Sequence, residues 1–200
     1  ALARAGEFAG QEGAASVEHL RKDLEAQRAE ERIRLMREAL EQGGGDIETR
    51  LRLIEELIVS DRIDEALHTS ELMLHEQPES LEPLLHTLEE ATRRPDVSFR
   101  LYDYLADLYF QQGRYDELLR LYRAMAEKSL EPARMIERGC LRILDRAPNH
   151  VETRRELALA RRSRSDWAGV IEAIDPMLAA EADGGTPLAP EDRALWVEAS

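Results

Sequence analysis

The residues of this sequence that could bind a metal or perform catalysis are few and scattered. His68 and His75 fall on one predicted helix, but they are seven residues apart, whereas a zinc-binding helix places its histidines four apart. His75 is followed closely by Pro78, which ends the helix before a metalloprotease motif could continue. These histidines therefore predict no metal site.

Other catalytic signatures are missing from the sequence as well. It contains no Gly-rich phosphate loop, no CxxC pair and no nucleophile elbow. Cys140 is the single cysteine, which excludes an internal disulfide, and its neighbours Leu141 and Ile143 favour a small buried hydrophobe over a nucleophile. We therefore predict a protein that is not an enzyme and uses no metal or cofactor.

Arginines form the densest group of charged side chains. Five of them fall within eleven residues: Arg154, Arg155, Arg161, Arg162 and Arg164. They could be a solvated helix face paired with Glu152 and Glu156. Alternatively, Arg155, Arg161 and Arg162 could anchor an acidic partner, or the group could mark a seam against which further helices pack.

Aromatic residues are concentrated in another region. Seven of the ten, including all five tyrosines, lie within 24 residues: Phe99, Tyr102, Tyr104, Tyr109, Phe110, Tyr115 and Tyr122. Tyrosine gives a large contact area at low entropic cost, so a docking surface is one interpretation. The preference of large residues for burial makes a packed core the other.

Composition excludes several partner classes. The 200 residues carry 27 Lys and Arg against 41 Asp and Glu, a net charge of −14. Phosphate backbones and anionic membranes would be repelled at long range, so we expect neither a nucleic acid nor a membrane surface as partner. No apolar run is long enough to span a bilayer, and cytoplasm and periplasm are both compatible with the sequence.

The elements that must position these residues are helices, because the apolar residues recur with a period of 3.6 and never alternate as in a strand. We expect a first helix at 16–42, stopped by three glycines, and then helices at 47–59, 62–76, 80–93, 97–112, 115–128, 132–146, 151–163 and 166–180. Prolines fall at the junctions, where they do no damage. Short connections make successive helices antiparallel neighbours in an all-α fold.

This pattern divides the chain into four parts. Residues 1–15 are rich in Ala and Gly and are expected to form a flexible lead. A long N-terminal helix occupies 16–45, the main helical region spans 46–183, and 184–200 form a loop and the start of a further helix. The apolar positions of the N-terminal helix are interrupted, and a role in homo-oligomer formation is an alternative for it.

The main region has an internal period of 52 residues, with units that begin at Ile47, Phe99 and Val151. Equivalent positions hold the same residue type in all three units: Leu53, Leu105 and Leu157, and Met73, Met125 and Met177. A unit of this length holds three helices. One hairpin cannot bury its apolar side alone, so hairpins of this kind are expected to stack.

The residues within these units resemble the tetratricopeptide (TPR) signature. The second unit carries it in Leu105, Ala106, Tyr109, Gly113, Tyr115, Leu118, Tyr122 and Met125, and the first in Leu53, Ile54, Leu57, Ala66, Ser70, Met73 and Pro78. The third departs at Arg161, where a large apolar residue is usual, and the helices at 80–93 and 132–146 lack the signature. The resemblance, over 47–183, implies a right-handed α-solenoid of stacked antiparallel hairpins that holds other proteins.

The TPR register also implies which aromatic residues pack and which contact a partner. It places four tyrosines in the core: Tyr102, Tyr109, Tyr115 and Tyr122. Tyr104, Phe110 and Ile58 fall off the packing side, so we expect these three to contact a partner in the inner groove, with Asp103 and Asp107 as flanking polar groups.

The expected groove is acidic at Glu55, Asp103 and Asp107, so it would repel the acidic carboxy-terminal tails that some TPR proteins grip. We therefore predict a non-enzymatic scaffold for a protein or peptide that is basic or apolar rather than acidic. Two alternatives remain. One is a regulatory, sensor or assembly module of a larger enzyme or of a secretion or envelope machine. The other is an oligomerisation element that uses the 16–42 helix.

Overall fold

The computed structural model of the chain describes residues 2–44, 46–185 and 187–200, and for residues 2–16, 43 and 44 it describes the backbone alone. Within these residues the structure has ten α-helices and no strand, which confirms the prediction of an all-α fold. No helix in the described part is both long and apolar enough to cross a membrane. The chain forms two compact units, residues 1–101 and 102–200, which from here on are called the first and the second unit and are not the 52-residue units of the sequence. The predicted region 46–183 spans both.

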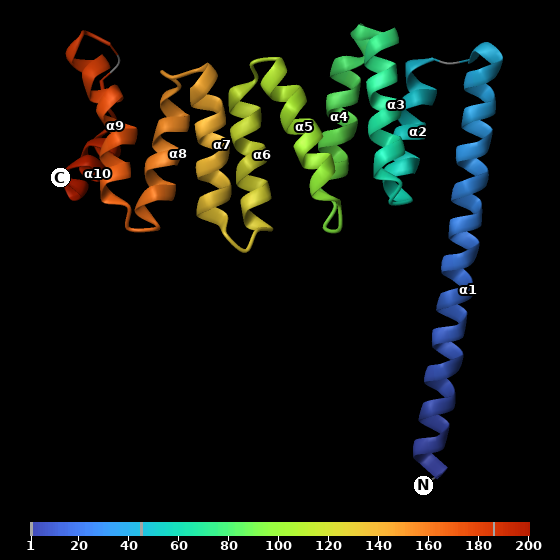
Figure 1. Ribbon diagram of the computed structural model, residues 1–200. Helices are drawn as coiled ribbons and strands as arrows, with labels where there is room; N and C mark the ends of the chain where they lie inside the picture. The colour runs from blue at the N-terminus through green and yellow to red at the C-terminus, as the bar shows by residue number, and fades with distance from the viewer. Residues whose placement is uncertain (1, 45, 186) are drawn as a thin grey trace. The chain divides into compact units, whose positions relative to one another are not determined.

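The first unit holds four complete helices and the beginning of a fifth: α1 (Leu2–Ala39), α2 (Ile47–Val59), α3 (Ile63–Glu76), α4 (Leu81–Thr92) and α5 (Phe99–Gln111). A π-helical turn follows α1 and a 3₁₀ turn precedes α4. Asp46 caps α2, because its carboxylate accepts a hydrogen bond of 2.8 Å from the Thr49 amide. α2 packs against α1, α3 and α4 (Figure 1).

Helix α1 starts earlier than the sequence predicts. It begins at Leu2, whereas we expected a helix from Ser16 after a flexible lead. Alanine has the highest helix propensity, so an alanine-rich segment can be helical without any periodic apolar side. The side chains of residues 1–16 lie outside the described part, and the flexibility of 1–15 stays a prediction. Further along α1, Ala29 and Ile33 are buried.

The second unit holds the rest of α5 and five further helices: α6 (Tyr115–Glu127), α7 (Pro132–Arg146), α8 (Val151–Arg162), α9 (Trp167–Ala182) and α10 (Pro190–Ala199). From α6 onward each helix packs against the next in the chain (Figure 1). Proline occupies the first helical position of α7 and α10, where its missing N–H leaves no carbonyl without a partner.

One type of turn recurs at 52-residue intervals, after α2, α5 and α8. In each, one residue has a positive φ: Asp61 (57°), Gly113 (68°) and Ser165 (59°). The next amide donates to the carbonyl five residues earlier, in the pairs Arg62 to Leu57 (2.8 Å), Arg114 to Tyr109 (2.9 Å) and Asp166 to Arg161 (3.0 Å). This is the hydrogen bond of a Schellman helix end. Corresponding residues of the three turns are 52 positions apart. The same type of turn also ends α9, outside that spacing, where Gly184 has a φ of 85° and the Gly185 amide donates to the Ala180 carbonyl at 2.9 Å.

The same spacing relates the starts of the helices and their buried side chains. α2, α5 and α8 begin at Ile47, Phe99 and Val151, and α3, α6 and α9 begin at Ile63, Tyr115 and Trp167. Six equivalent side chains are all buried: Leu53, Leu105, Leu157, Met73, Met125 and Met177. Burial of a leucine or methionine side chain stabilises a fold by about 1.5–3 kcal/mol. These positions therefore contribute to the core in the same way in each case.

Candidate functional site

Phe110 of α5 lies at the centre of a group of side chains from three helices. The Arg142 guanidinium lies 4.4 Å from the centroid of the Phe110 ring, and that of Arg146 lies 5.5 Å from it. Both arginines come from α7, four residues apart and so on one side of the helix. Tyr115 of α6 meets Phe110 edge-on, with centroids 6.5 Å apart. We call Asp107, Phe110, Tyr115, Arg142 and Arg146 the aromatic–arginine cluster.

Arg142 is held in place within this cluster. Its Nη2 donates to Oδ1 of Asp107 at 2.6 Å, and its Nη1 donates to the Tyr122 hydroxyl at 3.3 Å. Burial opposes the charged form, but these two hydrogen bonds outweigh it and raise the pKa of the Arg142 guanidinium. Arg146 is exposed and forms no ion pair with any residue that the structure describes. A fixed cation and an adjustable one thus both lie near the Phe110 ring.

The structure brings together some of the predicted contact residues. Asp107 and Phe110 meet through Arg142, and Asp103 lies one turn before Asp107 on the same side of α5. Asp103 and Asp107 are exposed, and Tyr104 is half-buried, as is Phe110. Four of the five predicted residues therefore lie on one helix of the second unit with some surface accessible.

Ile58, the fifth, is different. It belongs to the first unit and is 5% exposed, so the expectation that it lies off the packing side of its helix is wrong. Ile58 lines a hollow together with the segment 94–98 between α4 and α5.

The core interpretation of the tyrosines holds for three of four. Tyr102, Tyr109 and Tyr122 are buried, whereas Tyr115 is half-buried. The ring of Tyr115 meets the rings of both Phe110 and His150 edge-on, with centroids 6.1 Å apart for the latter pair. Tyr115 is therefore part of the cluster as well as of the packing.

The arginines of α8 bind mainly to other parts of the second unit. Arg155 donates to both carboxylate oxygens of Asp192 of α10 at 2.7 Å, and these bonds raise the pKa of the Arg155 guanidinium. Asp192 is buried, with 2% of its surface exposed. Arg162 pairs with Glu198, also of α10, at 2.8 Å. Arg155 and Arg162 thus fasten α10 to α8.

Arg161 occupies the position where the TPR signature has an apolar residue. It is buried, and it donates to the Gly169 carbonyl at 2.9 Å, to Glu172 at 2.8 Å and to Glu137 at 3.1 Å. Burial opposes its charge, but the carboxylates outweigh that effect and raise its pKa. This geometry favours a packing seam for the arginine group, while recognition of an acidic partner by Arg155, Arg161 and Arg162 stays a prediction.

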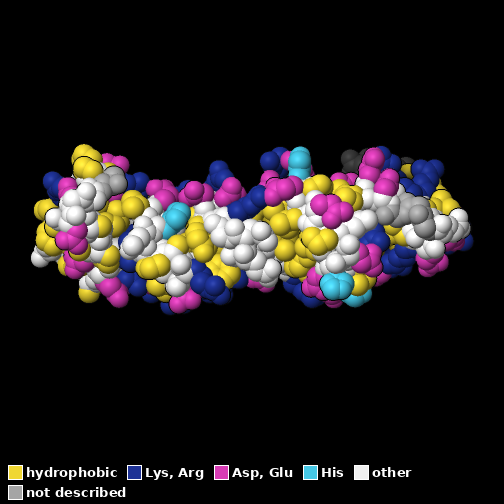
Figure 2. Space-filling model, turned by 90° about the horizontal axis from the view of Figure 1, so that it is seen from above, with side chains coloured by type: hydrophobic (Ala, Val, Ile, Leu, Met, Phe, Trp, Pro, Cys, Tyr) yellow, Lys and Arg dark blue, Asp and Glu magenta, His cyan; other side chains and the backbone are white. Residues whose placement is uncertain are grey.

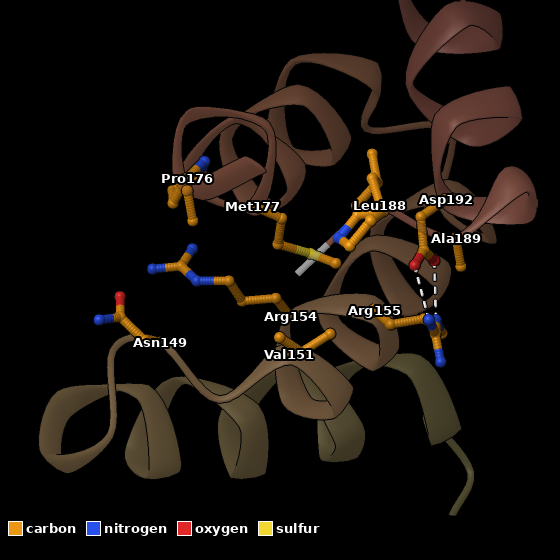
Figure 3. Close-up of a pocket in the computed structure, with 11 residues that line it drawn as sticks. Asn149, Val151, Arg154, Arg155, Pro176, Met177, Leu188, Ala189 and Asp192 are labelled. Carbon is orange, nitrogen blue, oxygen red and sulfur yellow. Dashed lines mark hydrogen bonds and ion pairs between the residues drawn. The ribbon is translucent and has the colours of Figure 1, made fainter. Parts of the chain in front are cut away.

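A pocket of about 360 Å³, which the sequence did not indicate, lies between the start of α8, the second half of α9 and the start of α10. Its lining is mainly apolar and includes Val151, Met177 and Leu188 (Figure 3). Arg155 points to Asp192 in this view, whereas Arg154 extends the other way, between Asn149 and Pro176. The pocket therefore combines an apolar interior with one available guanidinium.

Arg154 has no carboxylate partner among the described residues. Its Nε donates to the Pro148 carbonyl at 2.7 Å and its Nη1 to the Ala173 carbonyl at 3.3 Å. Burial lowers the pKa of this guanidinium, and no anion offsets the effect. The side chain remains a cation at neutral pH, so its charge is available to a bound anion.

Two further findings bear on chemistry at these sites. Burial raises the pKa of the Cys140 thiol to about 12, so this group is protonated and a poor nucleophile at neutral pH. In the part of the chain that the structure describes, no group of three or more His, Cys, Asp or Glu side chains could hold a metal ion.

A comparison with models of known protein families gives no match for this sequence, and a comparison with curated proteins gives none either.

Proposed function

We propose that this chain is a non-enzymatic scaffold that binds a protein or peptide partner, built as a right-handed, TPR-like solenoid of stacked helix hairpins. The turn that occurs three times at 52-residue intervals carries the proposal. The similar φ values, the corresponding hydrogen bonds and the equivalent buried side chains support it. Stacked hairpins of this type form extended surfaces, and such surfaces select partners by shape and charge.

The partner surface in this proposal is the exposed side of α5 together with the aromatic–arginine cluster. Asp103 and Phe110 are seven residues apart on one side of α5, which separates them by about 10 Å along the helix. A peptide in the polyproline II conformation covers about that distance in three residues, which is one turn, so side chains three apart point to the same side. The proposed ligand therefore places an apolar side chain on Phe110 and, three residues away, a basic side chain on Asp103.

Charge supports this choice of partner. The net charge of −14 attracts basic ligands at long range. On the face shown in Figure 2, acidic and basic side chains are interspersed, with hydrophobic side chains between them. Local pairing and apolar contact, rather than a field of one sign, would then decide the register of a bound peptide.

Selection from a displayed peptide library tests the proposal. Peptides enriched on the wild-type chain are expected to carry a basic and an apolar residue about three positions apart. Phe110→Glu should weaken their binding about tenfold or more, since buried aromatic anchors dominate such interfaces. Leu130→Glu is the matched control, because Leu130 is fully exposed between α6 and α7, outside the cluster. Circular dichroism verifies that both variants are folded.

Two results would reject the proposal. One is the absence of any enriched peptide. The other is equal affinity of the selected peptides for wild type and Phe110→Glu. Asp103→Lys adds a test of register, because it should reverse the preference at the basic position and leave the apolar position unchanged.

Self-association through α1 is a second candidate, favoured by one observation. Val17, Leu20 and Leu24 are exposed on α1 at helical spacing, with 67%, 65% and 48% of their surface accessible. Three apolar side chains on one side of a helix can pack against a second copy. Light scattering over a range of concentrations tests this role. A molar mass that rises with concentration in the wild type but not in Leu20→Glu supports self-association through α1. A monomer at every concentration excludes it.

A further inference from the structure

The pocket beside Arg154 lies at a position where the first unit has an ion pair. Counting back two periods of 52 residues, the counterpart of Arg154 is Arg50, whose Nη2 lies 2.5 Å from Oε2 of Glu76. The counterpart of Glu76 is Ala180. Both Arg154 and Ala180 line the pocket. The pair Arg154 and Ala180 thus has the same guanidinium as the pair Arg50 and Glu76, but a methyl group in place of the carboxylate.

The residues one period of 52 after Arg50 and Glu76 show that side chains at these two positions lie within contact distance. There the counterparts are Tyr102 and Lys128, and the Lys128 ammonium donates to the Tyr102 hydroxyl at 2.6 Å. Side chains at this pair of positions therefore meet in two of the three cases, Arg50 with Glu76 and Tyr102 with Lys128. In the third, Ala180 is too short to reach Arg154, and a cavity of about 360 Å³ lies between α8, α9 and α10.

We propose that this pocket binds a small monocarboxylate with an apolar chain, whose carboxylate takes the place beside Arg154 that the Glu76 carboxylate takes beside Arg50. Because Nε and Nη1 of Arg154 already donate to the Pro148 and Ala173 carbonyls, Nη2 is the donor that offers a charge-assisted hydrogen bond to a carboxylate. Val151, Met177 and Leu188 supply the apolar contact for the chain. A cavity of this size is within the range of small-molecule sites.

The surroundings favour a monoanion over a phosphate. Arg155 lines the same pocket, but its guanidinium already donates to both carboxylate oxygens of Asp192. Arg154 is therefore the one lining cation without an ion pair among the described residues. A dianion would leave a negative charge uncompensated against mainly apolar walls, which is costly. An aliphatic acid of about eight carbons, such as octanoate, fits these conditions and a pocket of this size class.

Isothermal titration of the full chain with octanoate tests this proposal, with octanol and octylamine as neutral and cationic ligands of the same length. Octanoate is expected to bind and the other two to bind about tenfold more weakly or not at all, because they lack the charge that pairs with Arg154. Arg154→Gln should reduce octanoate affinity by a similar factor. Arg50→Gln, the same substitution at the counterpart position, should leave it unchanged.

A second variant restores the ion pair inside the chain. Ala180→Glu puts a carboxylate at the position of Glu76, so it should pair with Arg154 and abolish octanoate binding. Ala179→Glu is the matched control, since Ala179 is an exposed neighbour and the charge change is the same. Melting temperatures show whether each variant is folded.

Three results would overturn the proposal. They are no octanoate binding at millimolar concentration, equal binding of octanoate and octanol, and unchanged octanoate affinity in Arg154→Gln or Ala180→Glu. Peptide binding at Phe110 is measured separately and shares no residue with this pocket. Failure at either site therefore leaves the other proposal standing.

Discussion

The turns that recur at 52-residue intervals lead to a quantitative prediction about glycine. Ser165 and Gly113 occupy the same position in two of these turns, with φ of 59° and 68°. Ser165→Gly should stabilise the fold, and Gly113→Ala should destabilise it. Asp61→Gly should stabilise less than Ser165→Gly, because aspartate tolerates the left-handed region better than serine does.

The magnitude follows from the backbone alone. A residue with a Cβ in the left-handed region costs about 1–2 kcal/mol, and replacing it by glycine removes this strain. The larger entropy of glycine in the unfolded chain offsets about 0.5–1 kcal/mol of the stabilisation. We expect Ser165→Gly to gain about 0.5–1 kcal/mol and Gly113→Ala to lose about the same. No steric term alters the second value, because a Cβ at Gly113 would meet no atom within 4 Å.

Urea denaturation followed by circular dichroism measures both changes. With a slope of about 2 kcal/mol per molar, the midpoint should rise by about 0.3–0.5 M for Ser165→Gly and fall by a similar amount for Gly113→Ala, at unchanged slope. A lower midpoint for Ser165→Gly, or a higher one for Gly113→Ala, would refute the turn geometry. The equivalence of the three turns, on which the solenoid proposal depends, would then be lost.

Three further predictions concern packing, the thiol and a helix cap. Gly139→Ala should destabilise by about 1–3 kcal/mol in the same urea assay, because its Cβ would lie 2.4 Å from the buried ring of Tyr122; a neutral or stabilising result would contradict this close approach of α7 to α6. Cys140 should resist thiol reagents at mildly alkaline pH until the chain unfolds, since its pKa is raised to about 12; rapid labelling of the native protein would show that it is accessible. Hydrogen bonds from Thr49 lower the pKa of Asp46 below its ordinary value of 3.8. The cap therefore stabilises α2 fully at pH values above 3.8, and this stabilisation is lost as the pH falls through the lowered pKa. Asp46→Asn keeps a capping side chain, and its urea midpoint should therefore change less than that of wild type between neutral pH and a pH below 3.8, whereas an equal change would argue against this cap.

Most of the helices could be predicted from the sequence because two independent signals coincide. The period of the apolar residues gives the helical segments, and prolines such as Pro78, Pro132 and Pro148 give their ends. The observed bounds after Asp46 lie within a few residues of those predicted. The start of α1 could not be predicted in this way, because a helix in an alanine-rich segment requires no periodic pattern.

The candidate sites were only partly predictable, since they depend on contacts between distant residues. The position of Phe110 on α5 was available from its spacing, but Arg142 lies 32 residues further on, in a helix without the TPR signature. Ile58 was misplaced because its burial depends on the tertiary packing of its helix, which the position within the 52-residue period does not give. The pocket was invisible in the sequence, because it is defined by a missing side chain at Ala180.

The equivalent turns at Asp61, Gly113 and Ser165 have a consequence for how such a chain can change its length. Genetic crossover between the codons of two equivalent turns, for example those of Asp61 and Gly113, would insert or delete one period of 52 residues while keeping the reading frame. The residue with the positive φ and the hydrogen bond of the turn would both be retained at the junction. A chain of this kind can thus gain or lose modules in single genetic events.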